Sequence, residues 1–544
     1  MPSTQHKPSE QQQAVLDWVK NGEGNLNLKA YAGTGKTSTL MMIAMAIKGM
    51  GDGFLGAFNK AIAEEFKERL AQQGSYWVKG ATIHSAGYSA WTKVTKGLGS
   101  PDSYKVKKLA QQVCAWDRKL QTAIKDTVGY AKQECLGVVG CDPYTATEPW
   151  QRIIEYYDMR EEIRGIPPEQ FISMCQDVYK RSLDLCKTVI DFDDMILAPL
   201  YYRAPFKKYD WVMIDEAQDT NTGRRLIAYE SMKADSRLIV VGDPYQSIYG
   251  FAGATNNAMD LIKEQMHSEE LSLSVTYRCP KSVVSVAQNW VPDFTAAPNA
   301  PQGLVTNLDH TDFWRQSFSF NDAILCRNTR PLVGIAGRLR DKGIQCVVEG
   351  QSGKALVALA IKWGEDLDLG TFLDKLREYE RTEVSKWMQK GQGERAETIQ
   401  DRCGTLRDLC KKLGKGGRKA LTEDLAKKIE FLFGDAPGVN TLRLCTVHRS
   451  KGREWNRVYL IGRNRYMPSV WAKKDWEQQQ ETNLMYVAVT RAKVELVEVE
   501  VPFKRKGYDT EWWEEGWRAS YEEDDLYDED QDQRWDHQNE EAGV

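Results

Sequence analysis

The chain has 544 residues, a formal net charge of −4 and eleven cysteines, none of which forms a Cys-x-x-Cys pair. Because single hydrophobic cores rarely grow beyond about 250–300 residues, this length predicts several domains. The slight negative charge excludes nucleic-acid binding through a global basic field, so any such contact must come from local patches. The scattered cysteines disfavour a zinc site. The sequence shows no secretory signal and no long apolar run, which disfavours a membrane partner and predicts a cytoplasmic protein, or a nuclear one in a eukaryote.

The segment from Ala30 to Thr37, Ala-Tyr-Ala-Gly-Thr-Gly-Lys-Thr, joins a short strand pattern to an apolar helix pattern. A glycine-bearing turn of this kind points backbone N–H groups inward and sets the positive end of a helix against an anion. Lys36 is placed to reach the outer phosphates of ATP, and the Thr37 hydroxyl is a natural Mg²⁺ ligand. The competing interpretation is a glycine-rich turn with a chance Gly-Lys-Thr, and Ala30 stands where such a motif usually opens with glycine. The residues expected to cradle the phosphates are Ala32, Gly33, Thr34, Gly35, Lys36, Thr37 and Ser38.

Strand patterns typical of buried parallel sheets recur along the chain, and two long helical stretches interrupt them. This rhythm predicts an α/β fold with two parallel-sheet cores, each carrying a helical insertion. The predicted parts are a first core over 1–85 and 188–270, a helical insertion over 86–187, a second core over 271–350 and 438–505, a short helical insertion over 351–437, and an acidic, disordered tail over 506–544.

Two polar segments follow predicted buried strands. Asp215 ends one strand and can hold Mg²⁺ beside the phosphates, and Glu216 is placed to deprotonate the attacking water, although an acidic pair here is often only a loop start. Gln246 follows the next strand, where its amide could sense the γ-phosphate. Tyr249 and Phe251 come directly afterwards and are suited to stacking on unpaired bases, at about 1–3 kcal/mol per base, or to ordinary core packing.

In this order the motifs resemble those of superfamily 1 DNA helicases of the UvrD/Rep/PcrA type, over about Gln11 to Lys493. Their wording is most similar to the branch that contains the F-box DNA helicases, although we expect a compact enzyme without an F-box. The resemblance implies two RecA-like cores of a P-loop NTPase, with a 1B-like first insertion and a reduced 2B-like second one. It also implies nucleotide contacts from Gln11, Tyr277, Arg278, Glu454 and Arg491, with Gln11 and Tyr277 at the adenine and the two arginines at the phosphates.

The same resemblance implies contacts with DNA on both cores, from Asn59, Thr82 and His84 on the first and Thr446 and His448 on the second. The acidic stretch 190–195 is similar to the family segment that precedes the Asp-Glu box. One loop departs from the family: residues 249–254 read Tyr-Gly-Phe-Ala-Gly-Ala, where both customary arginines are lost and tryptophan is replaced by phenylalanine. Charge-assisted contacts from this loop are therefore not expected.

The function implied is that of an ATP-dependent DNA helicase or translocase, moving 3′ to 5′ on single-stranded DNA and at single-strand/duplex junctions, in repair, recombination or replication. Two alternatives stay open, a translocase that strips proteins or remodels recombination intermediates, and a non-catalytic DNA-binding scaffold. The acidic tail carries Trp512, Trp513 and Trp517 among many carboxylates. It is interpreted as a solvated disordered segment, or else as a self-inhibitory or protein-docking one.

Overall fold

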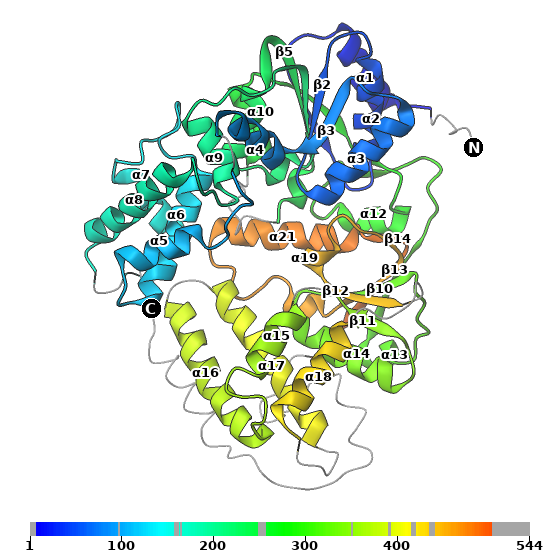
Figure 1. The fold of residues 1–544 in the computed structure, drawn as a ribbon. Coiled ribbons are helices and arrows are strands. Elements are labelled where there is room, and N and C mark those ends of the chain that lie inside the picture. The colour runs from blue at the N-terminus through cyan, green and yellow to red at the C-terminus, as the bar shows by residue number, and fades with distance from the viewer. Residues whose placement is uncertain are drawn as a thin grey trace.

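The computed structural model describes residues 7–95, 98–156, 163, 166–248, 257–349, 352–389, 393–414, 420–434 and 441–502. Two six-stranded parallel sheets, each flanked by helices, form the body of the chain (Figure 1), which confirms the predicted α/β class with two sheet cores. The predicted stacking residues Tyr249 and Phe251 and the acidic tail lie outside the described residues. Within the described part, no helix is long and apolar enough to span a membrane.

The first sheet has the order β3-β2-β4-β5-β1-β6, and every neighbouring pair is parallel. Its central strands are buried on both faces, as expected for a parallel sheet between helices. Its strands are β1 (Leu26–Ala30), β2 (Gly53–Ala57), β3 (Val78–Thr82), β4 (Tyr209–Ile214), β5 (Met232–Gly242) and β6 (Glu269–Leu273). The helices around it are α1 (Glu10–Asn21), α2 (Lys36–Ala46), α3 (Lys60–Gln73), α4 (Ile83–Val94), α9 (Asp194–Tyr201), α10 (Thr222–Glu230) and α11 (Ala258–Gln265), with short 3-10 turns η1 (Ala217–Asp219) and η2 (Pro244–Gln246).

Four helices inserted after α4 stand on one flank of the first sheet (Figure 1), and they are α5 (Lys105–Val113), α6 (Arg118–Gln133), α7 (Glu148–Tyr156) and α8 (Pro168–Leu185). Two buried lysines tie them to α9. The Lys105 Nζ donates to Asp194 at 2.6 Å, and the Lys132 Nζ donates to Asp191 at 2.6 Å and to Asp194 at 2.8 Å. Buried charges without partners are very costly, so this network fixes the insertion against the first core.

The second sheet has the order β11-β12-β10-β13-β14-β9, again parallel throughout. Its strands are β9 (Leu304–Asp309), β10 (Asp322–Cys326), β11 (Cys346–Val348), β12 (Leu442–Thr446), β13 (Trp455–Ile461) and β14 (Ala492–Glu500), while β7 (Val275–Thr276) and β8 (Thr295–Ala296) form a separate pair. The helices around it are α12 (Lys281–Ala287), α13 (His310–Phe313), α14 (Thr329–Asp341), α19 (Val447–Ser450), α20 (Arg463–Tyr466) and α21 (Asp475–Val489). The second insertion comprises α15 (Ser352–Ala360), α16 (Leu369–Gln389), α17 (Gly393–Gly414) and α18 (Thr422–Phe433).

Helix α21 lies between the two sheet cores in Figure 1 and carries side chains that reach the first core. The Asn483 amide donates to the Ser247 carbonyl at 2.8 Å, and the Tyr486 hydroxyl accepts from the Ala32 N–H at 3.0 Å. These contacts place the end of α21 directly against the turn after β1, where the predicted phosphate loop lies.

Candidate functional site: a phosphate loop facing arginines of the second core

The turn after β1 has the backbone that an anion-binding loop needs. Gly33 and Gly35 have φ values of +70° and +88°, in the left-handed region that favours glycine, and α2 begins directly after Gly35. The Lys36 Nζ donates to the Ala30 carbonyl at 3.0 Å, and the Thr34 hydroxyl donates to the Tyr31 carbonyl at 2.9 Å. Lys36 therefore folds back over the loop, beside the helix N-terminus that would face a phosphate.

The acidic pair at the end of β4 lies close enough to Lys36 for the charges to interact. Burial first, and the charge of Glu216 second, raise the pKa of Asp215 to about 7, against the opposing pull of Lys36. Burial also opposes ionisation of Glu216, but the charges of Lys36 and Lys451 outweigh it and lower the pKa of this carboxyl. Glu216 adopts φ +51°, a strained conformation for a non-glycine residue, of the kind that gathers at functional sites.

The Asp215 carboxylate also has the features of a metal ligand. Its Oδ1 atom is buried and has no hydrogen-bond partner among the described residues, although buried oxygens of this kind are normally paired. The hydroxyl of Thr37, at the start of α2, supplies a second oxygen donor of the type that Mg²⁺ prefers. The residues present therefore fit a magnesium ion held beside the phosphate loop.

Gln246 and Arg491 meet across the two cores. Gln246 is 5% exposed, and its amide nitrogen donates to Asp243 at 2.6 Å while its oxygen accepts from the Arg491 guanidinium at 3.4 Å. Arg491 is 1% exposed, and burial, with the neighbouring charge of Arg278, lowers its pKa to about 10. Among the described residues no carboxylate is hydrogen-bonded to Arg491, so the positive charge of its guanidinium is suited to receive an anion.

Arg278 approaches the phosphate loop from the segment after β7. Its Nε donates to the Glu454 carboxylate at 2.6 Å, and the N–H of Tyr277 donates to the Gly33 carbonyl at 2.9 Å. The Tyr277 ring is 57% exposed, so this predicted adenine-stacking surface is open to solvent. Glu454 also pairs with Lys493 at 3.5 Å, so both of its oxygens face cations.

Gln11, the predicted adenine-reading residue, is hydrogen-bonded to the start of the segment that leads to Arg278. Its amide nitrogen donates to the Ser274 hydroxyl at 2.9 Å, and its oxygen accepts from the backbone N–H of Ser274 and of Val275 at 3.0 and 3.3 Å. These bonds attach α1 to the strand end that leads to Arg278. Ser38 is exposed on the first turn of α2.

Sequence reasoning missed Lys451 and Asp219 as parts of the site. The Lys451 Nζ, from the second core, donates to the Asp219 carboxylate at 2.6 Å and to the Gln246 carbonyl at 2.6 Å, both on the first core. Lys451 stands inside the segment 446–454 and Asp219 ends the segment 212–219, so their places in these motifs were the available signals. Their pairing joins the two cores beside the acidic pair.

The predicted DNA-contacting residues divide between the two sheets. Asn59 and Thr82 follow the adjacent strands β2 and β3, and each caps the next helix, accepting from Ile62 N–H at 3.0 Å and Ser85 N–H at 3.1 Å. Thr446 stands at the corresponding position between β12 and α19. These turns all lie at the carboxyl ends of their strands, the edge at which open parallel sheets bind ligands.

The two predicted DNA-contacting histidines are neutral at physiological pH. Burial, with the charge of Arg224, lowers the pKa of His84 to about 4, and burial, with the charge of Arg327, lowers the pKa of His448 to about 3. The His448 Nε2 atom is shielded from solvent. As these side chains are placed here, each offers a DNA phosphate a hydrogen bond and not a positive charge.

Comparison with known proteins matches residues 9–267 to the UvrD/REP helicase N-terminal domain and residues 365–499 to the UvrD-like helicase C-terminal domain. F-box DNA helicase protein 1 of Schizosaccharomyces pombe is 25% identical over 547 residues, which cover 91% of this chain and 58% of that protein. The ATP-dependent DNA helicase PcrA of Bacillus subtilis is 26% identical, covering 54% of this chain and 40% of that protein. The ATP-dependent DNA helicase UvrD1 of Mycobacterium bovis is 28% identical, covering 52% and 38%. The chain thus spans between 38% and 58% of the length of these relatives, and it belongs to the UvrD/REP helicase family.

Proposed function

We propose that this protein hydrolyses ATP at the phosphate loop and couples the hydrolysis to 3′-to-5′ movement along single-stranded DNA and to unwinding of the adjoining duplex. The observation that carries the proposal is the contact of Arg491, from the second core, with Gln246 beside the loop of the first core. A nucleotide bound there would join the two cores, because Lys36 of the first core and Arg491 of the second would both neutralise the charge of its γ-phosphate.

The side chains supply separate parts of phosphoryl transfer. Lys36 and the N-terminus of α2 would hold the phosphates, and Mg²⁺ at Thr37 and Asp215 would offset their charge. Glu216, with its lowered pKa, stays ionised and can accept a proton from the attacking water. Arg278 and Arg491 would contact the γ-phosphate and stabilise the negative charge of the transition state.

Movement follows from the loss of these contacts after hydrolysis. When the γ-phosphate leaves, Arg278 and Arg491 would lose their anionic partner. The bound nucleotide would then no longer favour the closed arrangement of the two cores over an open one. A strand held by the turns at Asn59 and Thr82 on one core and at Thr446 on the other would then be carried as the cores separate and close again.

The test is strand displacement on three duplexes with a 3′ overhang, a 5′ overhang or blunt ends, with Lys36→Ala as the inactive control. We expect ATP-dependent displacement of the 3′-overhang substrate by the wild type and none by the control. Displacement of the 5′-overhang duplex alone would contradict the polarity. DNA-stimulated ATP hydrolysis without any displacement would instead favour a translocase that strips proteins, and absence of both would favour a binding scaffold.

A further inference from the structure

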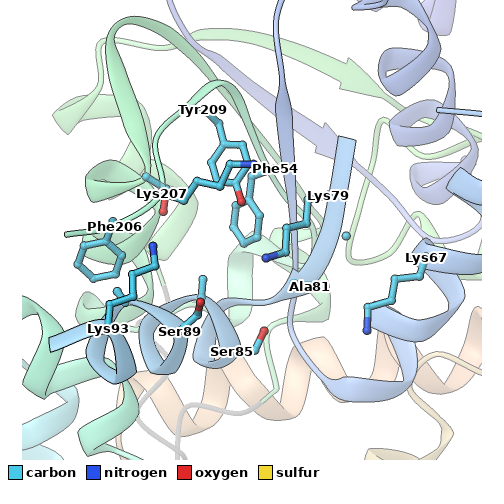
Figure 2. Close-up of a pocket in the computed structure, with 14 residues that line it drawn as sticks. Phe54, Lys67, Lys79, Ala81, Ser85, Ser89, Lys93, Phe206, Lys207 and Tyr209 are labelled. Atoms are coloured by element: carbon cyan, nitrogen blue, oxygen red, sulfur yellow. The ribbon is translucent and has the colours of Figure 1, made fainter. Parts of the chain in front are cut away.

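A cationic recess lies between β3 and α4, away from the phosphate loop (Figure 2). Its volume is about 220 Å³, and its lining includes the stacked rings of Phe54 and Tyr209, whose centroids are 5.4 Å apart. The wall on α4 carries Ser85, Ser89 and Lys93. These three side chains repeat every four residues, so they form one stripe along the helix.

The charge of the recess is entirely positive. Four of its lining residues are lysines and none is acidic, although the whole chain has a net charge of −4. In Figure 2 the side chains of Lys79 and Lys93 point toward one shared space from β3 and from α4, and the Lys207 side chain runs to the Tyr209 ring from the segment before β4. Clustered cations of this kind repel one another unless an anion lies between them.

Two of these lysines have no carboxylate of their own. Lys79 and Lys93 are exposed and form no ion pair within the described part of the chain. Lys207 lies 4.7 Å from the centre of the Tyr209 ring and pairs with Asp52 at 3.5 Å, whereas Lys67 pairs with Glu64 at 2.8 Å. The recess therefore offers at least two uncompensated ammonium groups, with the Ser85 and Ser89 hydroxyls beside them.

The recess begins beside the proposed DNA track at Ser85 and extends from there toward the amino ends of β2 and β3. Thr82 caps α4 by accepting from the Ser85 N–H, and Ser85 is the first lining residue of the recess on that helix. A strand that leaves the turn at Thr82 would next meet the stripe of Ser85, Ser89 and Lys93. Because the recess is too small for a duplex to enter, a single strand is the form of DNA that fits it.

We propose that this recess binds the phosphate backbone of single-stranded DNA beyond the track between the two cores, with Lys79, Lys93 and Lys207 as the phosphate contacts. The inference rests on the proposed function, because it needs a strand on the first core. Lysine ammonium groups bind successive phosphates without reading sequence, so the site would lengthen the footprint and slow dissociation of the strand.

The experiment compares two oligonucleotides by fluorescence anisotropy: the shortest strand that fully stimulates ATP hydrolysis, and the same strand extended by several nucleotides at either end. The variant carries Lys79→Gln, Lys93→Gln and Lys207→Gln. The matched control carries Lys20→Gln, Lys208→Gln and Lys427→Gln, at exposed lysines that do not line the recess.

We expect wild type and control to bind the extended strand more tightly than the short one, and the recess variant to bind both equally. Each phosphate contact contributes about 0.7 to the slope of log affinity against log salt, so three contacts contribute about 2. Between 50 and 200 mM salt, wild type should therefore lose about twentyfold more affinity for the extended strand than the recess variant loses.

The outcomes separate the two proposals. If no single strand of any length bound or stimulated hydrolysis, the proposed function would be refuted. Normal binding of the short strand with no gain on extension, or an equal gain in wild type and recess variant, would overturn the recess proposal alone. If the recess variant bound extended DNA normally but lost binding of a peptide comprising residues 506–544, the ligand would be an acidic peptide and the proposal would be wrong.

Discussion

Replacing Gly33 with alanine should separate the phosphate loop from Arg278 while the fold stays intact. A Cβ atom at residue 33 would lie 2.4 Å from the Arg278 Cβ and 2.7 Å from the Thr276 Oγ1. Neither atom is the far end of a flexible side chain, so the loop or the segment carrying Arg278 must move. The change therefore acts on the position of one proposed phosphate-facing arginine.

The free-energy cost of Gly33→Ala has two parts, and a second glycine of the chain provides a control that separates them. Gly33 has φ +70°, and a left-handed backbone costs a non-glycine residue roughly 1–2 kcal/mol. The steric overlap adds about 1–3 kcal/mol, as overpacking does elsewhere. Gly24 also has φ +70°, but a Cβ atom there meets nothing within 4 Å, so Gly24→Ala carries only the first cost.

The assay combines urea denaturation with steady-state ATP hydrolysis in the presence of single-stranded DNA. Both variants should lose about 1–2 kcal/mol of unfolding free energy from the backbone conformation. Only Gly33→Ala should also lose turnover, by about 5- to 150-fold if the overlap of 1–3 kcal/mol falls on the closed state. Equal turnover in Gly33→Ala and Gly24→Ala would show that the position of Arg278 against the loop does not matter for hydrolysis.

Three further changes test the buried charges. Because the pKa of Asp215 is raised to about 7, the protonated carboxyl contributes stability below pH 4, and this stability is lost as pH rises through about 7. Asp215→Asn should therefore raise the melting temperature of the nucleotide-free protein at pH 8 but not at pH 4. The same variant should lose about a hundredfold in ATP turnover, and an unchanged melting temperature at pH 8 would count against the assigned pKa. Arg491→Lys should recover little of the turnover lost in Arg491→Ala, because lysine lacks the planar fork that spans two phosphate oxygens. Full activity of Arg491→Lys in a hydrolysis assay would indicate a structural role for the arginine. Lys132→Met should lower the unfolding free energy in urea by about 3–5 kcal/mol, with partial recovery on adding Asp191→Leu, and a loss below about 1 kcal/mol would contradict the buried network.

The sequence predicted the sheets wherever strands are buried on both faces. The apolar runs at β4, β10, β12 and β13 mark central strands, and the structure confirms the two-core α/β class on them. The strands β6, β9 and β14 went unpredicted. The first two are edge strands with partly exposed side chains, and the interior strand β14 alternates apolar and charged residues. Polar residues are tolerated at sheet edges, so the hydrophobic pattern that identifies a strand is missing from β6 and β9. The edge strand β11 was predicted because its three residues are all buried and apolar.

The parts of the site that sequence could not predict are contacts between distant segments. The phosphate loop and the Asp215–Glu216 pair are visible because each directly follows a buried strand. The pairing of Lys451 with Asp219 joins residues 232 positions apart, and no local pattern specifies it. Lys105 and Lys132 are similar cases, since lysines in an amphipathic helix pattern are expected on the solvent face, and only the fold reveals the buried carboxylates of Asp191 and Asp194.

The proposed mechanism requires that the two cores share one nucleotide site. Steady-state ATP hydrolysis, measured with and without single-stranded DNA, tests it most directly when wild type, Lys36→Ala and Arg491→Ala are compared. We expect strong stimulation of the wild type by DNA and loss of turnover in both variants, although Lys36 and Arg491 stand on different cores. Normal DNA-stimulated turnover in Arg491→Ala would contradict a site built from both cores.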